Sequence, residues 1–148
     1  MKILVTGGSA FIGSTISDSL STKYKVISPT SQQLNLLNAS DVKDYLNKNS
    51  FDIVIHSANH LVHPLLKESK EPSIQLVNNL KMFFNIAINK NLFGKMIYFG
   101  SGAEFGRENW KSKMKESYFG NHYPTDQYGL SKYFMNIHTR LSKNIYNL

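Results

Sequence analysis

The sequence contains no cysteine, so it can form neither disulfide bonds nor thiolate metal sites. It has no apolar run near the roughly 18 residues that a membrane-spanning helix needs. The first apolar stretch, residues 3–5, is too short for a signal peptide because glycines follow it closely. These absences favour a soluble, cytoplasmic protein with no membrane partner. The 148 residues, of which 41% are hydrophobic, fit one globular domain of ordinary composition.

Acidic residues are fewer than basic ones, and the formal net charge of +7 raises the question of a nucleic-acid partner. The lysines are scattered, however, and only Lys111, Lys113 and Lys115 form a local run, which we interpret as a solvated loop face. Without a platform of aromatic residues for base stacking, we expect no nucleic acid to bind. His60 and His63 share a loop with no carboxylate close by, so we expect no metal site.

Short apolar runs alternate with segments of helical periodicity along the chain. The predicted strands are residues 2–6, 24–27, 34–36, 51–57 and 95–99, with the start of a sixth at 145–148. The predicted helices are residues 11–20, a helix capped by Ser40, 74–90 and 125–142. The first helix has Phe11, Ile12, Ile16 and Leu20 at apolar positions, and the last has Leu130, Tyr133, Phe134, Ile137 and Leu141. This alternation predicts an α/β fold with a doubly wound parallel sheet, which binds ligands at the carboxyl ends of its strands.

Three glycines, Gly7, Gly8 and Gly13, surround the turn between the first strand and the first helix. Gly7 permits a tight turn with positive φ, and Gly13 lets the helix pack closely on the strand. The backbone amides at the helix start can hold a pyrophosphate, helped by the helix dipole. A strand, a glycine turn and a helix in this order predict a dinucleotide site, although a purely structural turn would carry the same glycines.

The acidic residue that usually ends the second strand of such a site is missing, and residues 28–31 read Ser-Pro-Thr-Ser. A carboxylate there would bind the ribose diol of NAD and repel the 2′-phosphate of NADP. Its absence favours NADP, but no arginine stands nearby to hold that phosphate. The predicted cofactor is therefore NAD or NADP.

A second group of residues lies towards the end of the chain. Tyr128 and Lys132 are four residues apart on a predicted helix, so they project from the same face. A free phenol is a poor base at neutral pH, and a nearby ammonium group would stabilise its phenolate form. Tyr128 could then exchange a hydroxyl proton while hydride moves to or from a nicotinamide, with Ser101 holding the substrate oxygen. A Tyr–Lys pair on an exposed helix also occurs by chance, and the glycine turn distinguishes the two interpretations.

Several motifs occur in the order found in the extended short-chain dehydrogenase/reductase family, the group of NAD-dependent epimerases and dehydratases. Residues 6–13 resemble its TGxxGxxG turn, with Ala10 at the place of the middle glycine. Residues 52–58 are similar to its DVVIHxAA strand, residues 99–106 to its serine segment and residues 124–132 to its PxxxYGxSK helix. The resemblance covers essentially the whole chain.

The resemblance implies roles for individual residues. The catalytic set would be Ser101, Tyr128 and Lys132. The cofactor-binding residues would be Gly7, Ser9, Ala10, Phe11, Ile12, Gly13, Thr30, Asn35, Leu36, Ser57, Ala58, Asn79, Tyr128 and Lys132. Asn35 stands where the family usually has an aspartate that contacts adenine, and it retains a side-chain acceptor.

Family members of this kind act on nucleotide-activated sugars, so the resemblance implies a nucleotide diphosphate sugar as substrate. Gly102 and Ala103 follow Ser101 where sugar 4,6-dehydratases carry an acid pair, which makes a dehydratase a weaker alternative. Ala103 also replaces the catalytic cysteine of GDP-fucose synthases, which disfavours 3,5-epimerisation. An NAD(P)-dependent epimerase or 4-ketoreductase is favoured. A regulatory module that binds the dinucleotide without chemistry would not need the serine, tyrosine and lysine together.

Members of this family are about twice as long, and their second half completes the sheet and builds the sugar-binding domain. We therefore expect residues 1–148 to form a Rossmann-type NAD(P)-binding domain, with the substrate domain absent from this chain. Apolar faces prepared for the second half would be exposed, which favours self-association, for example as a homodimer. We expect the chain to bind the dinucleotide weakly and to turn over little.

Overall fold

The computed structural model describes residues 1–61 and 72–148, so His63 lies outside the described residues. Five parallel strands form one sheet in the order β2-β1-β3-β4-β5. They are β1 (Lys2–Thr6), β2 (Lys25–Ile27), β3 (Phe51–His56), β4 (Phe93–Tyr98) and β5 (Ile145–Asn147). The helices are α1 (Phe11–Ser21), α2 (Ala39–Asn49), α3 (Pro72–Ala87) and α4 (Gln127–Arg140). The predicted doubly wound, parallel Rossmann-type sheet is confirmed.

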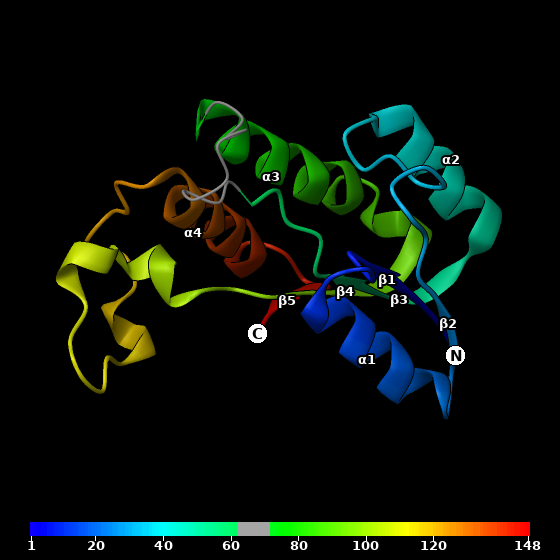
Figure 1. The fold of residues 1–148 in the computed structure, drawn as a ribbon, viewed down its shortest axis with the longest axis horizontal. Helices are drawn as coiled ribbons and strands as arrows, with labels where there is room; N and C mark the ends of the chain where they lie inside the picture. Colours follow the sequence, from blue (N-terminus) through cyan, green and yellow to red (C-terminus); the bar gives the residue numbers. More distant parts are fainter. Residues whose placement is uncertain (62–71) are drawn as a thin grey trace.

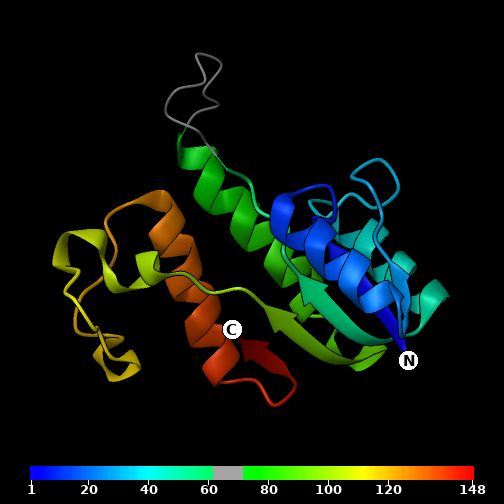
Figure 2. The ribbon, with the colours of Figure 1, turned by 60° about the horizontal axis from the view of Figure 1, so that its bottom comes forward.

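Helices cover the two faces of the sheet unequally. α1 lies on one face, and α2, α3 and α4 lie on the other (Figure 1). The larger apolar core lies under these three helices and includes Leu4, Val54 and Phe83, whereas Ile3 and Val5 belong to a smaller core under α1. Neighbouring residues of β1 serve different cores because side chains alternate along a strand. Figure 2 shows that α1 leaves β4 and β5 uncovered on its side of the sheet.

The predicted strand at residues 34–36 is wrong. The segment between β2 and α2 is a series of turns in which Leu34 is buried while Asn35 is exposed. The Asn35 side-chain oxygen accepts a hydrogen bond from the Leu37 amide at 3.1 Å, and this local bond bends the chain away from the sheet. The alternating leucines therefore reflect packing of a turn on the core rather than a strand.

Ser40 does not cap α2, as the sequence predicted. Asn38 is the N-cap, and its side-chain oxygen accepts hydrogen bonds from the amides of Ser40 at 3.0 Å and Asp41 at 3.4 Å. Asparagine and serine are both favoured at this position. The choice between them depends on where the chain leaves the preceding turn, which the sequence pattern did not reveal.

Two predicted apolar faces are only partly correct. Ile16 and Leu20 pack in the core under α1, but Phe11 is 85% and Ile12 48% exposed because the first turn of α1 stands at the rim of the glycine turn. In α4, Phe134 and Leu141 are exposed. The face that α4 buries is instead largely polar and consists of Gly129, Ser131, Lys132, Tyr133, Met135, Asn136 and Thr139.

Candidate active site

The glycine turn brings the end of β1 close to the end of β3. Gly7 has φ +74°, and a Cβ added to it would lie 2.6 Å from the backbone nitrogen of Ala58. A Cβ on Gly13 would collide with the carbonyl oxygen of Gly7. Both positions therefore require glycine, one for backbone conformation and close approach and the other for close packing of α1 on the turn.

The first turn of α1 is open to a ligand. Ala10 occupies the N-cap position without a side-chain hydrogen bond to the helix, and the first turn has no acidic residue. The amides at the start of a helix have no partners within the helix, and the helix dipole adds partial positive charge. The small Ala10 side chain leaves room for a group that binds these amides. The arrangement suits a phosphate or pyrophosphate.

A cavity of about 220 Å³ lies between the glycine turn and the segment that follows β2. Six of the predicted cofactor-binding residues line it, namely Gly7, Ser9, Thr30, Asn35, Leu36 and Ala58. Among the residues that the structure describes, none that lines this cavity carries a charge. The cavity therefore offers neither a carboxylate to repel a 2′-phosphate nor a cation to hold one.

Two other residues predicted to bind the cofactor, Ser57 and Asn79, make internal hydrogen bonds. The Ser57 hydroxyl donates to the Thr6 carbonyl at 2.6 Å and fixes the end of β3 beside β1. Asn79 is fully buried in α3, and its side chain accepts from the His60 amide at 2.7 Å and donates to the His60 carbonyl at 3.3 Å. These contacts hold the loop after β3 beside the cavity, and neither residue lines the cavity.

His56 ends β3 beneath the candidate site. Its Nδ1 lies 2.9 Å from the Thr6 hydroxyl, and the ring is buried against Phe83. Burial, and to a smaller extent the nearby charge of Lys132, lowers the pKa of His56 to about 3. His56 is therefore neutral. It contacts Thr6, at the end of β1, and lies close enough to Lys132 to be affected by its charge.

Ser101 follows β4 and caps a short 3-10 helix, η2 (Gly102–Phe105). Its side-chain oxygen accepts a hydrogen bond from the Ala103 amide at 3.2 Å. The hydroxyl is therefore oriented as an acceptor towards η2, and its proton is free to be donated elsewhere. The side chain is half-buried, so a ligand can reach it.

Tyr128 and Lys132 project from the first turns of α4, as their spacing predicted. Asp126 caps α4 by accepting from the Gly129 amide at 2.8 Å. Gly129 allows α4 to approach η2 closely. A Cβ at this position would lie 2.6 Å from the Ala103 carbonyl oxygen and would push the two elements apart. The close contact places the start of α4, with Tyr128, against the segment that carries Ser101.

The Lys132 ammonium group lies inside the protein. The residue is 7% exposed, and its Nζ donates to the carbonyl oxygen of Phe99 at 2.6 Å. Nζ lies 5.7 Å from the centroid of the Tyr128 ring and 5.6 Å from that of the Tyr98 ring. Burial lowers the pKa of Lys132 to about 8, and the carboxyl group of Glu104 acts in the opposite direction. The structure thus brings Tyr128 and Lys132 together. The lysine is held by the carbonyl group of Phe99, which precedes Ser101 by two residues in the chain.

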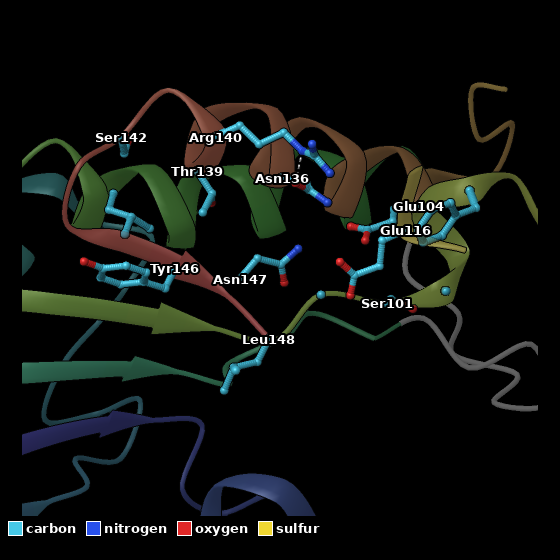
Figure 3. Close-up of a pocket in the computed structure, with 14 residues that line it drawn as sticks. Ser101, Glu104, Glu116, Asn136, Thr139, Arg140, Ser142, Tyr146, Asn147 and Leu148 are labelled. Carbon is cyan, nitrogen blue, oxygen red and sulfur yellow. Dashed lines mark hydrogen bonds between the residues drawn. The ribbon is translucent and has the colours of Figure 1, made fainter. Parts of the chain in front are cut away.

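Two charged residues near this group were missed by the sequence analysis. The Arg107 guanidinium lies 5.8 Å from the Tyr128 ring centroid, and its Nε is 3.5 Å from a carboxylate oxygen of Asp126. Glu104 is 5% exposed and lines a cavity of about 680 Å³ between α4, β5 and the segment after Ser101 (Figure 3). Glu104 lies in η2 and Arg107 in the 3-10 helix η3 (Arg107–Asn109), and helices this short show no periodicity in the sequence. A single acidic residue inside the serine segment was the only available signal for Glu104.

Within the described residues, no helix combines the length and the apolar character that crossing a membrane demands. The same residues bring together no group of three side chains suited to hold a metal ion. Lys111, Lys113 and Lys115 are exposed, as predicted for a solvated loop.

Comparisons with known proteins agree with this geometry. Residues 3–148 match the family described as the NAD dependent epimerase/dehydratase family. The chain is 30% identical over 111 residues to GDP-L-colitose synthase of Yersinia pseudotuberculosis, covering 73% of this chain and 36% of that protein. It is 30% identical over 89 residues to GDP-L-fucose synthase of Azorhizobium caulinodans, covering 60% of this chain and 28% of that protein.

The fold also matches a solved structure, that of the GDP-mannoheptose C4 reductase of Campylobacter jejuni with NADP bound. The TM-score is 0.77 at 22% sequence identity, over 93% of this chain and 42% of that one. The chain thus spans less than half of each of these proteins. Because a match to the family extends over residues 3–148, the chain belongs to the NAD dependent epimerase/dehydratase family.

Proposed function

We propose that this chain is the cofactor-binding part of an NAD(P)-dependent enzyme that reduces or epimerises a nucleotide diphosphate sugar, with Tyr128 as the acid/base. The observation that carries the proposal is the buried Lys132 ammonium group, held at the Phe99 carbonyl and 5.7 Å from the Tyr128 ring centroid. Burying a lysine ammonium group is strongly unfavourable, and in this site the buried ammonium group lies beside a phenol.

The residues divide the proposed chemistry among them. The open helix start after Gly7 and the uncharged cavity beside it fit a dinucleotide, which when bound supplies or accepts a hydride at a sugar carbon. Tyr128 gives a proton to the carbonyl oxygen in reduction and removes it from the hydroxyl group in oxidation. Lys132 stabilises the phenolate form, and the Ser101 hydroxyl donates a hydrogen bond to the same substrate oxygen and keeps its own proton.

Ketone reduction is the form of the reaction that we favour. Gly102 and Ala103 provide no acid or base at the two positions directly after Ser101, where sugar 4,6-dehydratases carry an acid pair, and this disfavours the removal of water. Reduction needs only one proton and one hydride on the same carbonyl group, and the proposed set accounts for that proton. The similarity to two GDP-sugar synthases and, in fold, to a C4 reductase supports a nucleotide 4-keto sugar as substrate.

The cofactor part of the proposal is tested by titration calorimetry of the folded chain with NADPH, NADP⁺, NADH and NAD⁺. We expect weak binding of both types, because the described residues that line the cavity include no charged group that selects for or against the 2′-phosphate. A chain with native circular dichroism that binds none of the four would contradict the proposal.

The catalytic part is tested by mixing excess chain with NADPH and a nucleotide 4-keto sugar and following absorbance at 340 nm. We expect slow oxidation of NADPH that Tyr128→Phe abolishes while NADPH affinity is kept. The control is Tyr24→Phe, a partly exposed tyrosine at the opposite end of the strands. Equal rates in the two variants would exclude Tyr128 as the acid.

A further inference from the structure

Glu104 is an unusual residue for the place that it occupies. Its side chain is 5% exposed, and its Oε2 has no hydrogen-bond partner among the described residues. Acidic side chains are almost never this buried unless they are paired. Figure 3 shows the carboxylates of Glu104 and Glu116 on the same side of the cavity, near Ser101. Nothing in the proposed proton transfer uses either of them.

η2, which carries Glu104, packs on α4, which carries the proposed catalytic lysine. Gly129 allows the contact between these elements, and Lys132 and Asn136 follow one turn apart on the face of α4 that is buried there. The Asn136 side chain lies beside the Glu104 carboxyl group and favours its ionised form. No direct ion pair forms, since the structure of residues 1–61 and 72–148 has one ion pair, Arg107–Asp126.

The titratable groups that interact electrostatically with Glu104 come from three elements. They are Lys132 and Arg140 on α4, Glu116 on the 3-10 helix η4 (Glu116–Tyr118), and the neutral phenol of Tyr98 on β4. Burial raises the pKa of Glu104 to about 7, whereas Asn136, Lys132 and Arg140 lower it. The Arg140 guanidinium is already engaged, because its Nε donates to the Asn136 side-chain oxygen at 2.9 Å and the group lies 4.4 Å from the Phe119 ring centroid.

The groups around Lys132 are fewer. The rings of Tyr98 and Tyr128 lie near Nζ, and the Phe99 carbonyl accepts one hydrogen bond from it. The charge of Lys132 also disfavours the protonated form of His56. Glu104 is the group whose charge favours the ammonium form against the effect of burial. His56 stays neutral and provides no compensating charge.

We infer that Glu104 is a positioning residue for the proton-transfer site, a buried counter-charge that keeps Lys132 protonated and so sets the upper pH limit of the reaction. The effect on the pH limit of the reaction rests on the proposed function. The effect of Glu104 on the pKa of Lys132 requires no cofactor. A buried ammonium group without this carboxylate would lose its proton at a lower pH, and Tyr128 would lose the charge that stabilises its phenolate.

The test is the pKa of Lys132 itself, followed through the ¹³Cε signal of a lysine-labelled chain across pH 6 to 11. The signal is assigned by its absence in Lys132→Gln. In Glu104→Gln, which keeps the size of the side chain, we expect the pKa of Lys132 to fall by about one pH unit. The matched control is Glu116→Gln, which removes a charge from the same cavity wall and leaves Lys132 unchanged. Equal pKa values for Lys132 in wild type and Glu104→Gln would overturn the inference.

A measurement on the unaltered chain covers the case in which Glu104→Gln does not fold. The Glu104 carboxyl ¹³Cδ signal and the Lys132 ¹³Cε signal are recorded in one titration. Because each charge stabilises the other, we expect the Lys132 signal to respond in two steps, one of them in the range in which Glu104 titrates. A single Lys132 step that is independent of Glu104 would contradict the inference.

The catalytic consequence is read separately from the pH dependence of NADPH oxidation. Glu104→Gln should move the alkaline limb to lower pH while the rate at the optimum changes less. If the chain binds no dinucleotide, the proposed function fails, but the comparison of Lys132 pKa values still decides whether Glu104 is its counter-charge. An unshifted alkaline limb in an active Glu104→Gln variant would reject the role in catalysis.

Discussion

The glycine turn and the Tyr128–Lys132 site lie at the same edge of the sheet, but they are built in opposite ways. The cavity at the glycine turn is lined by uncharged residues. Its capacity to bind phosphate comes from backbone amides at the start of α1, which the small glycine and alanine residues of the turn leave accessible. The second site depends on buried charged side chains, Lys132 and Glu104. The first should therefore be sensitive to added atoms, and the second to altered charge and to pH.

Removing the phenol hydroxyl from the charged site should have the largest effect. Tyr128→Phe takes away one proton donor and leaves the glycine turn intact, so turnover should fall about 10²- to 10⁴-fold with unchanged NADPH affinity. Single-turnover absorbance and calorimetry measure the two quantities. Loss of affinity equal to the loss of rate would show that the two sites cannot be separated in this way.

His56 lies between the two sites and gives the next largest effect, on stability. Its pKa in the folded chain is about 3, so between pH 6.5 and 3 the unfolded chain binds a proton that the folded chain does not. The contribution of His56 to stability should therefore fall as the pH falls through this range, by about 1.4 kcal/mol for each pH unit. Glu104 acts oppositely between pH 4.5 and 7, because its raised pKa makes the folded chain hold a proton that the unfolded chain has released.

The contribution of His56 is isolated by comparing urea unfolding of wild type and His56→Gln at several pH values. Glutamine can keep a hydrogen bond to Thr6 but cannot be protonated in this range. We expect a smaller fall in stability with acid for the variant. Identical slopes would show that His56 is not held neutral in the folded chain.

An added methyl group tests the glycine turn. Gly13→Ala would force the Gly7 carbonyl and α1 apart, so we expect a loss of about 3 kcal/mol in unfolding free energy and weaker dinucleotide binding. Gly102→Ala is the control, because its Cβ would only contact the Trp110 ring at 3.4 Å. Equal stability losses for the two substitutions would contradict the steric account of this turn.

A substitution remote from both sites sets the scale for these effects. Asn38→Ala removes the cap of α2 and should cost about 1 kcal/mol, measured by urea unfolding at neutral pH. Ser40→Ala, at the position that the sequence pattern favoured as the cap, should cost less because the Asn38 oxygen still accepts from both amides. A larger loss of unfolding free energy for Ser40→Ala than for Asn38→Ala would show that Ser40 is the cap.

The sequence predicted the glycine turn better than the charged site, for physical reasons. β1 and β3 are largely buried parallel strands that contain continuous apolar runs, Ile3-Leu4-Val5 and Ile53-Val54-Ile55, and the glycines around the turn are a local signal. The buried face of α4 was misjudged because Ser131, Lys132 and Asn136 are polar, whereas periodicity assigns polar residues to solvent. Glu104 could not be found, since its burial depends on the packing of η2 against α4. Local rules fail here at the place proposed for chemistry.

The claim that both sites serve one ligand is tested most directly by NMR of the chain with NADP⁺ bound. The account predicts nuclear Overhauser contacts from nicotinamide H4 to the ring protons of labelled Tyr128, and none to Tyr24. A bound dinucleotide whose nicotinamide protons contact other residues but not Tyr128 would contradict it.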